Sequence, residues 1–139
     1  MDKDRLDQVF DMQRGLQKRI GTPESVVSGA SLKQAQFKHA DAEFEVLTWH
    51  KEFTLSLMME AAELMDWMPW KHWSKQLGNK EFVEPYGATH VSEVHLEIVD
   101  CLHFLVNLSL LWGLTPQRMF EIYQEKNAIN AARQESGKY

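Results

Sequence analysis

Hydrophobic side chains recur at three- and four-residue intervals along four stretches of the chain, which is the pattern of amphipathic helices. In the first stretch the apolar positions are Leu6, Val9, Phe10, Met12, Leu16 and Ile20. Three more helices and a short helical turn are predicted over about 42–68, 91–112, 115–134 and 70–76. Pro69, Gly113 and Pro116 support these boundaries, because proline ends or opens a helix and glycine commonly caps one.

The segments between these helices have a different composition. Residues 21–31 contain three Ser, two Gly, one Thr and one Pro, and residues 77–90 contain two Gly and one Pro, so both are predicted to be irregular. No stretch has the pattern of a convincing strand, and there is no internal repeat. The economical assembly is all-α, an antiparallel bundle of four main helices in a single domain over residues 1–139.

Composition and charge indicate which kinds of binding partner are not expected for this chain. The chain is 44% hydrophobic, which is enough for one sizeable core in 139 residues. Its net charge is −5 and its basic residues are scattered, so neither a nucleic-acid polymer nor an anionic membrane surface is an expected partner.

Cysteine usage and the first residues suggest the compartment. The single cysteine, Cys101, cannot form an intramolecular disulfide, and it lies in an apolar run where a buried, inert thiol is expected. The N-terminus lacks the pattern of a secretory signal, and no apolar run is expected to reach the roughly 18 residues of a membrane-spanning helix. We therefore expect a soluble, cytoplasmic protein.

The most apolar predicted helix carries an unusual polar stripe. Glu93, Glu97, Asp100, His103 and Asn107 follow one another at spacings of 4, 3, 3 and 4 residues, which places them within an arc about 120° wide. The rest of the circumference is almost wholly apolar. A helix of this kind has no ordinary solvent face, so its polar stripe is predicted to line an internal site.

A second pair of acids lies in the preceding long helix. Glu60 and Glu63 are one turn apart among apolar residues, so both carboxylates can project in one direction, toward Glu97 and Asp100. Crowded carboxylates repel one another and are usually held by a cation, and an all-oxygen set suits Mg²⁺ or Mn²⁺ better than zinc. A di-iron bundle and ordinary solvated helix charges are the alternative interpretations.

The last predicted helix offers cations and amides on one face. Lys126, Asn130 and Arg133 lie at positions i, i+4 and i+7, a spacing that would suit an oligophosphate. A solvated terminal helix would have the same composition.

These motifs together resemble the all-α nucleoside triphosphate pyrophosphatases, the MazG-like superfamily, and in particular its dimeric dUTPases with their phage and bacterial relatives. The superfamily pattern, ExxE followed by ExxD, stands here as Glu60-Ala-Ala-Glu63 and Glu97-Ile-Val-Asp100. LDQVFDMQRGLQ, PWKHW, EIVDCLHFLVNLSLLWGL and KNAINAARQESG are also similar, and the resemblance covers nearly the whole chain.

The resemblance implies a role for each matching residue. Glu60, Glu63, Glu97 and Asp100 would hold Mg²⁺, with Mn²⁺ a substitute, and Glu60 and Glu63 would be catalytic. The phosphate contacts would come from Lys71, Lys126, Asn130 and Arg133. Base and sugar contacts would come from Gln13, Gln17, Trp49, Trp70, Trp73, His103 and Asn107. Gln17 stands where relatives have asparagine, which leaves the base preference open.

The predicted activity is hydrolysis of a deoxynucleoside triphosphate to the monophosphate and pyrophosphate, with bound metal activating a water that a glutamate orients. The leading substrate is dUTP, and the alternatives are dCTP, both nucleotides, or another deoxynucleoside triphosphate. A homodimer is expected, since the apolar surface of the third main helix is too broad for a small monomer to cover. The rival class is a non-enzymatic helical interaction module.

Overall fold

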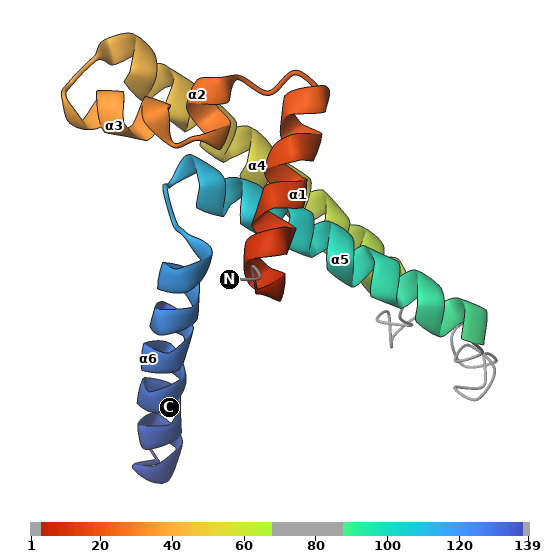
Figure 1. Cartoon of the computed structure of the whole chain (residues 1–139). Coiled ribbons are helices and arrows are strands. Elements are labelled where there is room, and N and C mark those ends of the chain that lie inside the picture. Colours follow the sequence, from red (N-terminus) through yellow and green to blue (C-terminus); the bar gives the residue numbers. More distant parts are fainter. Residues whose placement is uncertain (1–3, 68–87, 138–139) are drawn as a thin grey trace. The chain divides into compact units, whose positions relative to one another are not determined.

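The computed structural model describes residues 4–67 and 88–137, and within them every regular element is an α-helix (Figure 1). The helices are α1 (Arg5–Arg19), α2 (Glu24–Val27), α3 (Ala30–Gln36), α4 (Ala40–Asp66), α5 (Ala88–Leu111) and α6 (Pro116–Glu135). Helices α1, α4, α5 and α6 correspond to the four predicted stretches. The all-α class is therefore confirmed.

The segment after α1 differs from its prediction. Residues 21–31 were expected to be irregular, but most of them lie in the short helices α2 and α3. The reason is burial, because Val26 and Val27 are only 1% and 2% exposed, and packing of an apolar side outweighs weak local helix propensity. The helical turn predicted over 70–76 lies outside the described residues, as does most of the irregular segment 77–90, of which 88–90 are helical.

The chain divides into two compact units, one formed by residues 1–46 and 109–139 and the other by residues 47–108. In the first unit, α2 packs against α1 and α3, and α1 packs against α6. Its core contains the buried side chains of Phe10, Val26, Val27, Ala42, Val46, Leu110 and Leu111. The prediction of a single domain remains a prediction.

Polar contacts join the short helices to the start of α4. The hydroxyl groups of Ser25 and Ser31 both donate to Oε2 of Glu45, the first at 3.0 Å. Gly29 precedes α3 in the left-handed region, with φ of 70°, and a Cβ there would lie 3.3 Å from the carbonyl oxygen of Leu110. Position 29 therefore favours glycine for its conformation and for its closeness to neighbouring backbone.

The predicted boundary between α5 and α6 is confirmed in its detail. Gly113 has φ of 65°, and backbone hydrogen bonds run from Gly113 to Leu110 and from Leu114 to Ser109, which is a Schellman motif. Helix α6 then opens with Pro116 in its first turn and with Thr115 as N-cap, whose hydroxyl oxygen accepts from the backbone N–H of Arg118 at 3.2 Å.

In the second unit, α4 and α5 lie side by side (Figure 1). They run antiparallel, because Glu60 interacts electrostatically with Asp100 and His103, whereas Trp67, further along α4, bonds to Glu97, which is earlier in α5. Phe53, Val106 and Asn107 are its most buried side chains. Many large apolar side chains are exposed on these two helices, among them Leu55, Met58, Met59, Met65, Leu96, Ile98, Val99, Leu102 and Leu105.

One correction concerns the membrane. No membrane-spanning run was expected from the sequence, but the segment Val91–Leu111 of α5 is long and apolar enough to span a bilayer by length and composition. Core helices of soluble proteins pass the same test. This segment also contains Glu93, Glu97 and Asp100, whose insertion into lipid would be costly.

Candidate metal centre on two antiparallel helices

The acidic pairs of α4 and α5 meet in the second unit. Glu60, Glu63 and Glu97 each offer a carboxylate oxygen, and these three atoms all lie within 4.8 Å of one another. Glu60 and Glu63 are three residues apart on α4, a spacing that turns both side chains toward α5. We call these three residues the carboxylate cluster.

Asp100 lies at the edge of the carboxylate cluster. It is close enough to Glu60 to influence the pKa of that side chain, but it is not among the three converging ligands. Its Oδ1 atom is 3.4 Å from Nδ1 of His103, one turn further along α5. Of the four predicted metal ligands, three therefore converge directly and the fourth pairs with a predicted base or sugar contact.

Electrostatics in the cluster favour a bound cation. Burial raises the pKa of Glu60 above its ordinary value of 4.5, and the negative charges of Glu63, Asp100 and Glu97 raise it further, while His103 lowers it. The pKa of the Cys101 thiol is also raised, first by burial and then by Glu60, Glu97 and Asp100. A positive ion would relieve this repulsion.

The donor set fits the metal that the sequence suggested. The converging atoms are all carboxylate oxygens, which are hard ligands suited to Mg²⁺ or Mn²⁺, and the three residues offer no thiolate or imidazole of the kind that zinc prefers. An inward Glu-x-x-His pair from each of two helices, as a di-iron bundle requires, is not found in the described residues.

One residue near the cluster was not predicted from the sequence. Trp67 directly follows α4, and its indole Nε1–H donates to Oε1 of Glu97 at 3.4 Å. The sequence feature that could have predicted this contact is the position of Trp67, four residues after Glu63 and seven after Glu60. That spacing places all three residues on the same face of the helix.

Three of the predicted base or sugar contacts lie in the second unit. Trp49 packs against Phe53 one turn along α4, with ring centroids 5.2 Å apart and planes inclined at 41°. Asn107 is buried, and His103 is half-buried beside Asp100. These positions leave the assignment of Trp49, His103 and Asn107 to a base or sugar as a prediction.

In the first unit, the two predicted glutamines are interior side chains. Gln13 and Gln17, one turn apart on α1, are 4% and 5% exposed. Oε1 of Gln17 accepts a hydrogen bond from the hydroxyl of Thr22 at 2.6 Å, so this carbonyl already has a partner within the protein. The contact of either glutamine with a base stays a prediction.

The predicted phosphate contacts lie on a different part of the chain. Lys126, Asn130 and Arg133 are exposed on α6, which has no buried residue. They belong to the first unit and the carboxylate cluster to the second. Trp70, Lys71 and Trp73 lie outside the described residues.

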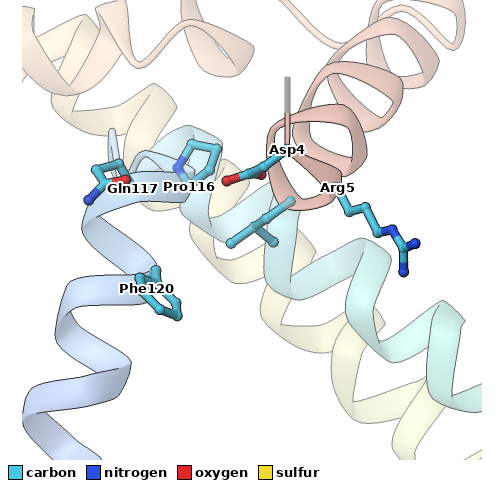
Figure 2. Close-up of a pocket in the computed structure, with 6 residues that line it drawn as sticks. Asp4, Arg5, Pro116, Gln117 and Phe120 are labelled. Atoms are coloured by element: carbon cyan, nitrogen blue, oxygen red, sulfur yellow. The ribbon is translucent and has the colours of Figure 1, made fainter. Parts of the chain in front are cut away.

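A pocket of about 480 Å³ lies in the first unit, at the starts of α1 and α6 (Figure 2). Asp4, Arg5, Leu6, Pro116, Gln117 and Phe120 line it. Figure 2 shows the carboxylate of Asp4 turned toward Pro116 and the guanidinium of Arg5 extending away on the other side. Of the predicted site residues that the structure describes, none lines this pocket.

Paired carboxylates facing each other on antiparallel helices are the arrangement expected from the resemblance to the all-α nucleoside triphosphate pyrophosphatases. The comparison with known families is consistent with that class: the chain belongs to the dUTPase family, whose model matches residues 5–118. The resemblance drawn from the ordered motifs is therefore confirmed, and the chain is a nucleoside triphosphate pyrophosphatase.

Two curated relatives come from phages and are both named dCTP pyrophosphatase. The protein of Enterobacteria phage LZ5 is 28% identical over 151 residues, covering 96% of this chain and 83% of that protein. The protein of Enterobacteria phage T4 is 28% identical over 149 residues, and the match covers 98% of this chain and 84% of the phage T4 protein. No solved structure matches the chain significantly.

Proposed function

We propose that the chain hydrolyses a pyrimidine deoxynucleoside triphosphate to the monophosphate and pyrophosphate, with divalent cations held by the carboxylate cluster. The observation that carries this proposal is the convergence of Glu60, Glu63 and Glu97 within 4.8 Å in a member of the dUTPase family. The family favours dUTP as the substrate. The names of the two phage relatives favour dCTP, which is the second candidate.

Each acid has a separate task in this proposal. Glu60, Glu63 and Glu97 hold the cation, and Asp100 completes the set from the edge of the cluster. When bound there, Mg²⁺ or Mn²⁺ would neutralise charge on the phosphates and make a nearby water more acidic. Glu60 or Glu63, the two residues that the resemblance makes catalytic, would orient that water for attack.

The remaining substrate contacts follow from chemistry and from the family. Lys126 and Arg133 provide positive charge and Asn130 a neutral donor on one face of α6, which suits the oxygens of the phosphate chain. Lys71 would add a cation. We assign the base and sugar to Gln13, Gln17, Trp49, Trp70, Trp73, His103 and Asn107.

We further propose a homodimer in the cytoplasm of a phage-infected cell. The exposed leucine, methionine, isoleucine and valine side chains of α4 and α5 form more apolar surface than a soluble monomer usually leaves in water. A second copy of the chain would cover it. Light scattering coupled to gel filtration tests the pairing, and a monomer at micromolar concentration would contradict it.

Pyrophosphate release from a panel of nucleoside triphosphates, with and without Mg²⁺, tests the activity. We expect release from dUTP, dCTP or both, only when the cation is present. Glu63→Gln should abolish turnover without changing helical content. Glu52→Gln is a matched control, because Glu52 is an exposed acid on the same helix, outside the cluster. A helical interaction module would release no pyrophosphate under any condition.

A further inference from the structure

Trp67 contributes to the carboxylate cluster without being able to bind a cation itself. It directly follows the last residue of α4, and it lies on the helix face that carries Glu60 and Glu63. Its indole N–H reaches across to α5 and donates to Oε1 of Glu97 at 3.4 Å. One side chain therefore connects the two helices beside the predicted ligands.

The chemistry of indole suits this position. Its nitrogen is a donor only, so it cannot compete with the carboxylates for a cation, and it remains a donor at every pH at which the protein is folded. The hydrogen bond occupies one oxygen of Glu97 and leaves the second oxygen available as a ligand. The ring is half-buried, so the donor is held in place beside Glu97.

Without such a restraint, Glu97 would tend to swing away from its neighbours. Its carboxylate lies within 4.8 Å of two others of the same charge, and repulsion favours rotamers that separate them. Residues that hydrogen-bond to metal ligands commonly hold those ligands in their binding orientation. Trp67 has this relationship to Glu97 through its indole N–H.

We propose that Trp67 is a positioning residue, which holds Glu97 in the orientation that binds a divalent cation together with Glu60 and Glu63. The inference rests on the proposed function, because it assumes that the carboxylate cluster is the cation site. It makes Trp67 a determinant of cation affinity rather than of the chemical step.

The test is a titration of the purified chain with Mn²⁺, in which the free ion is measured by electron paramagnetic resonance. Trp67→Phe keeps an aromatic ring and removes the N–H donor, and it should weaken Mn²⁺ binding about tenfold. At saturating Mn²⁺, the kcat and KM for the nucleotide should stay within about twofold of the wild-type values. Trp112→Phe is the matched control and should bind Mn²⁺ as the wild type does, since Trp112 is outside the cluster.

A double-mutant cycle separates positioning from general packing. In a Glu97→Ala background, Trp67→Phe should cause no further loss of Mn²⁺ affinity, because the residue through which it acts is gone. An equal loss in both backgrounds would overturn the inference. So would a Trp67→Phe variant that binds Mn²⁺ within twofold of the wild type.

A measurement on the unaltered chain covers the case in which Trp67→Phe does not fold. The indole ¹H–¹⁵N resonance of Trp67, assigned by its absence from Trp67→Tyr or by selective labelling, should shift on Mg²⁺ addition with the midpoint of cation binding. A resonance that does not respond would overturn the inference while leaving the proposed function intact. Failure of the wild-type chain both to bind Mn²⁺ and to release pyrophosphate would overturn the proposed function itself.

Discussion

Replacing Glu63 with glutamine should stabilise the metal-free chain while abolishing its activity. One carboxylate oxygen from each of Glu63, Glu60 and Glu97 lies within 4.8 Å of the other two, and two unit charges at that distance repel by about 1 kcal/mol at the dielectric constant of water. Glu63 takes part in two such pairs. Because its side chain is exposed and salt screens the repulsion, we expect a net gain of about 1 kcal/mol in the free energy of unfolding.

Thermal unfolding in EDTA, followed by circular dichroism at one fixed protein concentration, measures this gain. A change of about 1 kcal/mol should raise the Tm of a chain of this length by about 4 °C. Adding Mg²⁺ should reverse the order of the two Tm values, so that the wild type becomes the more stable protein. A ligand that binds only the folded state stabilises it in proportion to the logarithm of ligand concentration over Kd. Mg²⁺ should therefore raise the Tm of the wild type more than the Tm of Glu63→Gln.

The control is Glu52→Gln, which removes an exposed acid from the same helix, 3.5 Å from Lys51. It should not raise the Tm in EDTA, and it should leave the effect of Mg²⁺ unchanged. The reasoning would be refuted if Glu63→Gln were no more stable than the wild type in EDTA. It would also be refuted if Mg²⁺ stabilised both proteins equally.

Three further predictions concern stability. The pKa of Glu60 is raised above 4.5 in the folded chain, so just above that pH the folded state binds more protons than the unfolded state. Unfolding scans in EDTA should therefore show the free energy of unfolding falling as pH rises through this interval. Glu60→Gln should make that fall smaller. Thr22→Val leaves the buried carbonyl of Gln17 without its donor and should cost about 1–2 kcal/mol in urea unfolding, whereas Thr22→Ser should cost less. Gly29→Ala forces a side chain into the left-handed region beside the Leu110 carbonyl, and the same measurement should show a loss of about 1 kcal/mol or more.

Much of the fold and part of the site could be predicted because they depend on short spacings within one helix. The three-residue interval between Glu60 and Glu63 turns both side chains to one face in any regular helix, so their convergence needed no knowledge of the tertiary structure. The end of α5 just before Gly113 and the start of α6 at Pro116 likewise follow from the backbone preferences of single residues.

What could not be predicted depends on contacts between segments. The hydrogen bond from Trp67 to Glu97 exists only at one axial offset of α4 against α5, which no spacing along the chain specifies. Helices α2 and α3 form in a segment rich in serine and glycine because Val26 and Val27 become buried, which composition alone does not reveal. The interior position of Gln17 depends in the same way on a partner, Thr22, beyond its own helix.

The environment of Cys101 also bears on how the protein can be handled. Alkylating reagents and oxidants attack the thiolate, and burial together with three nearby carboxylates keeps this sulfur in its protonated form. The same negative charges that gather cations therefore protect the thiol. A maleimide dye should label the metal-free protein slowly near neutral pH and faster once a cation has neutralised the carboxylates, so the labelling rate at a single sulfur atom would indicate whether the neighbouring site is filled.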